Sequence, residues 1–125
     1  MSKQRILVCD DEEGVRESLK LILEDHYDVH AAEHGEAAIT CVAQAPYDIM
    51  LLDIKMPRMD GIEALRRVRQ LAPRMPELVL TAYHSMDIAK EAIRLGASDY
   101  LSKPFDKDQV LDAIEHLLKR NQTVT

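Results

Sequence analysis

The feature that most constrains the fold is an apolar run that ends in an acid. Residues 49–52 are Ile-Met-Leu-Leu and precede Asp53, and Pro57 and Gly61 follow at short distance. An apolar run without alternation is typical of a strand buried on both faces of a parallel sheet. Proline and glycine then favour a loop. Asp53 is therefore expected at the carboxyl end of a central strand, where open α/β sheets bind their ligands.

The remainder of the chain alternates between strand-like and helix-like segments. Further strands are predicted over residues 5–9, 27–32, 77–81 and 98–101. Three helices are predicted, one from the end of the first strand to about residue 25 and two over residues 35–45 and 61–72. A fourth helix is predicted from a cap at Ser85 or Asp87 to Gly96. The last helix is predicted to begin at a capping box formed by Asp106 and Gln109. This alternation predicts right-handed crossovers and a doubly wound parallel sheet covered by helices on both faces. We expect a flavodoxin-like (CheY-like) fold with five strands in the order 2-1-3-4-5 and five helices.

Composition limits the function classes. The 125 residues, of which 46% are hydrophobic, suit a single domain, expected over residues 1–120 with 121–125 as a polar tail or the start of a linker. A net charge of -6 disfavours direct nucleic acid binding by this segment. Cys9 and Cys41 form no metal-ligand pattern and are expected to be buried thiols. Such thiols fit a reducing compartment, so we expect a cytoplasmic protein. No stretch approaches the ~20 apolar residues of a membrane span.

Polar residues gather at the ends of the predicted strands. Asp10 and Asp11 follow the first strand, Thr81 ends the fourth and Lys103 follows the fifth. In the predicted order the first and third strands are neighbours, ~4.8 Å apart, so Asp10 and Asp11 should lie beside Asp53. Three such carboxylates repel one another unless a cation joins them, and Mg²⁺ (or Mn²⁺) prefers oxygen ligands and phosphate. Each acid alone would be explained as a helix cap or a turn residue, but together they indicate phosphoryl transfer.

The combined motif resembles the receiver domain of two-component response regulators. The resemblance extends from residue 6 to about residue 119 and rests on Asp10-Asp11, Asp53 with Met56-Pro57 and Asp60-Gly61, Thr81-Ala82, and Lys103-Pro104-Phe105. The segment is also similar to receivers of NtrC-like transcription activators and to single-domain phosphorelay carriers. A response regulator of this kind is a signalling switch and not a turnover enzyme, although it assists its own phosphorylation and dephosphorylation.

The resemblance implies a role for each site residue. Asp53 would accept the phosphoryl group from a phosphohistidine of a sensor histidine kinase or a phosphotransfer protein. Mg²⁺ would be held by Asp53, by Asp11 directly, by Asp10 through water and by the backbone carbonyl of Lys55. Thr81 and Lys103 would bind phosphoryl oxygens, and the Lys103-Pro104 bond would be cis, as few X-Pro bonds are.

The resemblance also implies how the signal leaves the site. Thr81 would move toward the phosphoryl group and Tyr100 would change rotamer. The fourth helix, fifth strand and last helix would then form a two-state face for a possible effector domain or homodimer.

Two flanking residues are expected to set the phosphoryl lifetime. Lys55 and Tyr83 lie two positions beyond Asp53 and Thr81, where long side chains would exclude the attacking water. A Lys55 that is simply a solvated surface charge is the alternative.

Three other classes of protein fit the sequence less well. A haloacid-dehalogenase-like phosphohydrolase also uses a strand-end Asp nucleophile, but it needs a second Asp where this chain has Lys55. A flavodoxin needs a Ser/Thr-rich phosphate loop in place of the acids that follow Cys9. A phosphorylation-independent pseudo-receiver would be expected to lack one of the five site residues, and all five are present. The five histidines are scattered, and each is expected to be a surface or loop residue.

Overall fold

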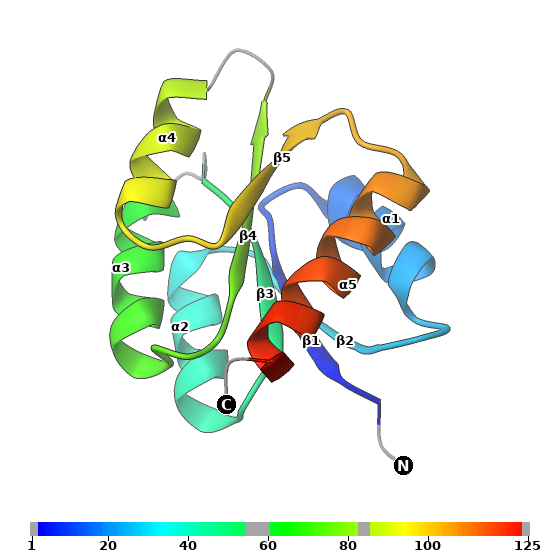
Figure 1. Cartoon of the computed structure of the whole chain (residues 1–125), viewed down its shortest axis with the longest axis horizontal. Helices are drawn as coiled ribbons and strands as arrows, with labels where there is room; N and C mark the ends of the chain where they lie inside the picture. The colour runs from blue at the N-terminus through cyan, green and yellow to red at the C-terminus, as the bar shows by residue number, and fades with distance from the viewer. Residues whose placement is uncertain (1–2, 55–60, 83–85, 124–125) are drawn as a thin grey trace.

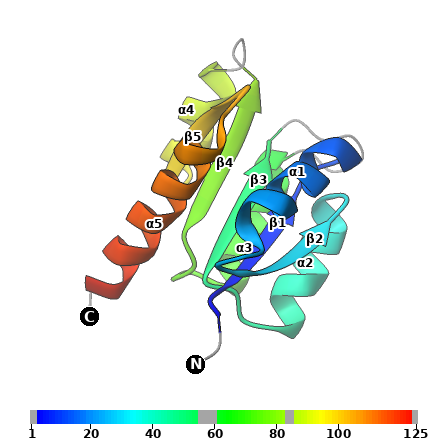
Figure 2. The same ribbon diagram turned by 90° about the vertical axis from the view of Figure 1, so that its right-hand side faces the viewer.

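The computed structural model describes residues 3–54, 61–82 and 86–123, with side chains to Arg120. Ten elements alternate along it: β1 (Arg5–Cys9), α1 (Glu13–Leu23), β2 (Asp28–Ala32), α2 (Gly35–Gln44), β3 (Ile49–Asp53), α3 (Gly61–Leu71), β4 (Glu77–Ala82), α4 (Met86–Arg94), β5 (Asp99–Lys103) and α5 (Lys107–Thr123). The strands form one sheet in the order β2-β1-β3-β4-β5, and every neighbouring pair is parallel. This confirms the predicted topology, which Figures 1 and 2 show from two sides.

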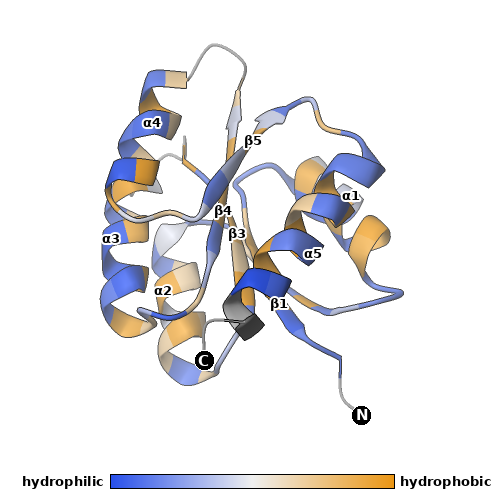
Figure 3. Ribbon diagram, viewed as in Figure 1, coloured by the Kyte–Doolittle hydropathy of each residue, from blue (hydrophilic) through white to orange (hydrophobic). Residues whose placement is uncertain are grey.

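Two hydrophobic layers separate the sheet from its helices. Helices α2, α3 and α4 cover one face, and α1 and α5 cover the other (Figure 1). Because successive strand residues point to opposite faces, Leu7 and Met50 enter the first layer while Ile6 and Leu51 enter the second. Figure 3 shows the apolar residues concentrated on the central strands and on the helix faces turned toward them. Both layers being apolar explains why β3 is buried along its whole length.

The helix ends follow local chemistry. Asp106 and Gln109 exchange backbone-to-side-chain hydrogen bonds of 2.9 and 2.8 Å, so the predicted capping box is confirmed. Gly96 has a φ of 114°, the left-handed conformation predicted after α4. His34, expected to be a plain surface or loop residue, caps α2 by accepting a hydrogen bond from Ala37 N at 3.2 Å.

Most boundaries lie within one or two residues of the predictions, and the differences at α4, α5 and β5 have a consequence or a physical reason. Asp87 lies inside the first turn of α4 and is not its cap, while the alternative Ser85 lies outside the described residues. α5 continues to Thr123, into the segment predicted as a polar tail, because residues 119–123 contain no glycine or proline to stop it. β5 extends to Lys103, so the site lysine ends the strand itself.

Candidate phosphoacceptor site

Asp10 is held from every side at the end of β1. Its side chain is fully buried, its Oδ1 accepts a hydrogen bond from Glu12 N at 2.9 Å, and its Oδ2 accepts one from Lys103 Nζ at 3.0 Å. Its backbone carbonyl accepts a hydrogen bond from Arg16 Nη1 at 2.9 Å. Both carboxylate oxygens are therefore engaged by this chain.

Asp53 ends β3 beside this carboxylate. It is 5% exposed, and its Oδ2 lies 3.6 Å from Lys103 Nζ. The same ammonium lies 3.7 Å from Glu12 Oε1. Lys103, at the end of β5, thus joins two acids of the loop after β1 to the acid that ends β3.

The charge of Lys103 is stabilised by these acids. Burial alone would lower the pKa of Lys103, since it disfavours the charged form. The hydrogen bond to Asp10 and the charges of Asp53, Asp10 and Glu12 outweigh burial, so the pKa of Lys103 is raised. Lys103 is therefore a fixed positive charge at physiological pH.

Carboxylate oxygens also gather in the loop that follows β1. Carboxylate oxygens of Asp10, Asp11 and Glu12 lie within 4.8 Å of one another, with Asp10 buried and the other two exposed. Such a set of hard oxygen donors fits a divalent cation such as Mg²⁺. The sequence prediction groups Asp10 and Asp11 with Asp53 and does not include Glu12. Its position directly after Asp10-Asp11 was the available signal.

Thr81 and Tyr100 lie on the same face of neighbouring strands. Thr81 is 1% exposed and pairs with Ser102, two residues beyond Tyr100. The Thr81 hydroxyl donates a hydrogen bond to Ala82 O at 3.3 Å. Tyr100 pairs with Val79 and is 38% exposed. Lys55 and Tyr83, the predicted lifetime residues, lie outside the described residues, as does the predicted Lys55 carbonyl ligand.

A groove opens directly beside Lys103. It has a volume of about 630 Å³ and lies between α1 and the segment after β5, where Gly14, Val15 and Ser18 face Pro104 and Phe105. The Lys103-Pro104 peptide bond is cis, which confirms the expectation from the sequence.

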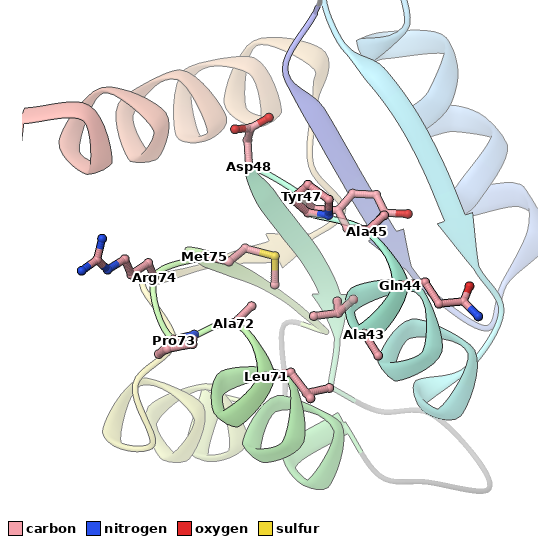
Figure 4. A pocket seen from close by; sticks show the side chains of 12 residues that line it. Ala43, Gln44, Ala45, Tyr47, Asp48, Leu71, Ala72, Pro73, Arg74 and Met75 are labelled. Atoms are coloured by element: carbon pink, nitrogen blue, oxygen red, sulfur yellow. The ribbon is translucent and has the colours of Figure 1, made fainter.

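Another cavity lies at the opposite end of the strands, beside the start of β3. It has a volume of about 560 Å³ and lies between the ends of α2 and α3 (Figure 4). Its walls are largely apolar, with Tyr47, Leu71 and Met75 among them. Asp48 also lines it, but the Oδ2 of Asp48 accepts a hydrogen bond from Arg5 N at 2.7 Å. The acids and the lysine of the candidate site are at the other end of the strands.

The fold and the strand-end acids define a receiver domain, and comparison with known proteins agrees. The family described as the response regulator receiver domain matches residues 6–115, so the chain belongs to this family of two-component signalling domains. Receiver domains are signalling domains and not classical turnover enzymes. In the described part of the chain, no helix is long and apolar enough to cross a membrane.

Several relatives show how this domain is used elsewhere. The chain is 40% identical over 116 residues to the regulatory protein AtoC of Escherichia coli, covering 92% of this chain and 25% of AtoC. It is 41% identical over 117 residues to the response regulator MprA of Mycolicibacterium vanbaalenii, covering 93% of this chain and 51% of MprA. The chain therefore spans about a quarter of AtoC and about half of MprA.

Solved structures have the same fold. A CheY-like receiver domain protein of Methanospirillum hungatei superposes with a TM-score of 0.94 at 30% identity, covering 99% of this chain and 100% of that chain. NtrX of Brucella abortus superposes with a TM-score of 0.93 at 27% identity, covering 97% of this chain and 28% of that chain.

Proposed function

We propose that the protein is a phosphorylation-activated switch in which Asp53 accepts a phosphoryl group from a phosphohistidine. The donor is a sensor histidine kinase or a phosphotransfer protein. The observation that carries this proposal is the link from Lys103 Nζ to Asp53 Oδ2, 3.6 Å, and to Asp10 Oδ2, 3.0 Å. A nucleophilic carboxylate and a fixed cation meet at one strand end, which suits in-line phosphoryl transfer.

The transfer exchanges one bond to phosphorus for another. A carboxylate oxygen of Asp53 forms the new O–P bond as the N–P bond of the phosphohistidine breaks. The imidazole nitrogen keeps the electron pair of the broken bond. Lys103 is a compact point charge whose raised pKa keeps it positive, so it neutralises charge on the phosphoryl oxygens.

The acids around Asp53 are proposed to hold Mg²⁺ or Mn²⁺. Asp11 is exposed and suits a direct ligand, whereas both oxygens of Asp10 are already engaged, which suits contact through water. Asp53 and the carbonyl of Lys55 complete the proposed set. A bound divalent ion supplies positive charge to the transferring phosphoryl group.

The output is proposed to be a change in the face formed by α4, β5 and α5. Phosphorylation adds charge of roughly -1.5 to -2 at Asp53. Thr81 and Lys103 are drawn toward the new oxygens, and Tyr100 fills the space left beside Thr81. Their shared face on neighbouring strands supports this coupling. An effector domain or a second copy would read the changed face.

The donor is proposed to be a protein and not only a small phosphodonor. The groove of about 630 Å³ beside Lys103 offers apolar walls from Val15 and Phe105 to a partner segment. We further propose a cytoplasmic location and a role upstream of transcription, supported by similarity to the longer regulators AtoC and MprA. The net charge of -6 disfavours nucleic acid binding by this segment itself.

Mass spectrometry after incubation with Mg²⁺ and a small phosphodonor tests the proposal. The wild-type chain should gain one phosphoryl group, and Asp53→Asn should gain none. Asp112→Asn, which changes an exposed acid on α5, serves as the matched control and should behave as wild type. Wild-type labelling in Asp53→Asn would refute Asp53 as the acceptor, and an unlabelled wild type would favour a pseudo-receiver.

A further inference from the structure

A fully buried acid lies at the amino end of β4, whereas Thr81 lies near the carboxyl end of the same strand. Glu77 begins β4, and its side chain is completely buried. Its backbone is fixed by Ser98, whose Oγ accepts a hydrogen bond from Glu77 N at 3.3 Å and whose N donates one to Glu77 O at 3.0 Å. Burying a carboxylate is costly unless it is paired and hydrogen-bonded.

Among the residues that the structure describes, one counter-charge pairs with Glu77, and it comes from a helix on the same face of the sheet. Arg69 of α3 donates from Nη1 to Glu77 Oε1 at 2.9 Å, and the Arg69 side chain is 31% exposed. The other carboxylate oxygen, Oε2, is buried without a hydrogen-bond partner in the described part of the chain. The pair is thus half satisfied, which is an expensive arrangement for an ionised carboxylate.

The turn that ends α4 lies directly over this arginine. A Cβ added at Gly96 would lie 2.5 Å from Arg69 Nε and 2.9 Å from Arg69 Cζ. The turn is closed by hydrogen bonds of 3.0 Å from Gly96 N to Ile93 O and from Ala97 N to Ala92 O. Arg69 therefore passes under the turn on its way from α3 to β4, between helices that are neighbours in Figure 1.

Within residues 3–54, 61–82 and 86–120, Arg69 is the charged group that acts on Glu77. On β3 the register partner of Glu77 is the apolar Met50. On β5, Asp99 follows Ser98, and the Oδ1 of Asp99 accepts a hydrogen bond from Tyr100 N. Burial raises the pKa of Glu77 from an ordinary value of 4.5 to about 7, even though Arg69 acts in the lowering direction.

We propose that Arg69, Glu77 and Gly96 form a proton-dependent latch that fastens the end of α4 to α3 and β4. When Glu77 is ionised, its charge holds Arg69 under the turn. When Glu77 gains a proton, Arg69 loses its counter-charge and can turn toward solvent, which loosens the turn above it. The latch needs no phosphorylation, so it stands independently of the proposed function.

The latch lies on the same strand face as Thr81. Alternate residues of β4 point to this face, namely Glu77, Val79 and Thr81. Glu77 at one end of this row contacts Arg69, and Thr81 at the other end belongs to the phosphoacceptor site. α4 packs over this row through Ala92, which lies in the same hydrophobic layer as Val79. Loosening the turn therefore changes how firmly one end of the proposed output face is held.

Nuclear magnetic resonance titration from about pH 3 to about pH 9 tests the latch. The side-chain carbon of Glu77 and the amides of Gly96 and Ala97 should shift together with a midpoint near 7. Glu77→Gln should abolish the shift of both amides. Glu91→Gln, which removes a partly exposed acid paired with Arg94 on α4, is the matched control and should leave the shift of both amides unchanged. A Glu77 midpoint near 4.5, or amides of the turn that do not follow Glu77, would overturn the latch.

A second arm tests the contact between the turn and the arginine. Gly96→Ala places a methyl group against Arg69 and should raise the Glu77 midpoint by about half a unit or more, because the counter-charge is displaced. Arg69→Met should raise it in the same direction. Gly14→Ala is the matched control, since a Cβ there meets nothing within 4 Å. An unchanged midpoint in both Gly96→Ala and Arg69→Met would show that Arg69 does not act on Glu77.

Discussion

Lys103 is the single residue that ties the candidate site together. Its ammonium lies within 4 Å of carboxylates from Asp10, Glu12 and Asp53. In the absence of another cation it compensates their negative charge, and a bound divalent ion must share these acids with it. The same charge that suits phosphoryl transfer therefore opposes metal binding.

Lys103→Met separates these two effects. Removing the ammonium should tighten Mg²⁺ binding about three- to tenfold, because a repelling charge is lost, while phosphoryl uptake at Asp53 should slow. Isothermal titration calorimetry measures the affinity, and mass spectrometry measures the uptake. Lys119→Met, which removes an exposed lysine paired with Glu115, should change neither. Weaker Mg²⁺ binding in Lys103→Met would contradict the argument.

Lys55 and Tyr83 concern the duration of the signal. If their side chains exclude the attacking water, Lys55→Asn should shorten the phosphoryl lifetime, since a shorter amide can orient a water in line with the phosphorus. Tyr83→Ala should also shorten the lifetime, by removing the second side chain that excludes water. Dephosphorylation rates at fixed Mg²⁺ measure this, and equal rates in wild type and both variants would sink the idea.

At the scale of elements, the start of α3 is packed tightly on the end of β3. Gly61 N donates to Ile54 O at 3.2 Å, and a Cβ at Gly61 would overlap the backbone of Ile54. The strand that carries Asp53 is thus held against the next helix by a contact that no other residue type permits.

Gly61→Ala should destabilise the fold by about 1–3 kcal/mol, the usual cost of overpacking. Gly14→Ala, in the first turn of α1 with nothing near its Cβ, should be neutral or stabilising by up to about 1 kcal/mol. Urea unfolding followed by circular dichroism compares the two. Equal losses of stability would show that the approach of Gly61 to Ile54 is unimportant.

The pair formed by Arg69 of α3 and Glu77 of β4 makes the stability of the fold depend on pH. The folded state binds the Glu77 proton more tightly than the unfolded chain, because the pKa of Glu77 is about 7 in place of 4.5. This tighter proton binding adds to the free energy of unfolding. The added stability is therefore fully present below the unfolded pKa of 4.5 and is lost as the pH rises through 7. The free energy of unfolding of Glu77→Gln, relative to wild type, should increase by about 1–3 kcal/mol between acid and alkaline pH.

A control variant separates the pH dependence caused by Glu77 from the effect of removing any acidic side chain. Glu63→Gln, on the exposed side of α3, should show no such trend, since that side chain is 45% exposed. Urea unfolding at a series of pH values provides the comparison. A difference between Glu77→Gln and wild type that is independent of pH would count against a raised pKa at Glu77.

Sequence patterns predicted the elements better than their chemistry. Apolar runs and capping residues located every strand and helix, because burial and caps act locally. The burial of Glu77 was missed because its pairing with Arg69 crosses from β4 to α3 and leaves no periodic signal. Glu12 was missed because its approach to Lys103 depends on how the end of β1 meets that of β5.

At the scale of the whole molecule, the two ends of the sheet carry different chemistry. The carboxyl ends of the strands bring together acids and Lys103, while the amino ends carry the buried Glu77 and the apolar cavity of Figure 4. The chain as a whole has a net charge of -6. Asp10, Asp11 and Glu12 lie together in the folded chain, so repulsion among their carboxylates lowers the stability of the folded state.

A divalent cation that binds only the folded site should therefore stabilise the entire chain. Mg²⁺ at about 100 times its Kd should add about 2.7 kcal/mol by mass action, which thermal unfolding detects as a rise in Tm. Asp11→Ala should remove most of this rise, because Asp11 is the exposed acid proposed to bind the ion directly. Asp112→Asn should keep it, as that acid lies on α5 away from the cluster. Equal ionic strength from NaCl separates screening from binding, and a full Mg²⁺ response in Asp11→Ala would disprove the proposed ligand set.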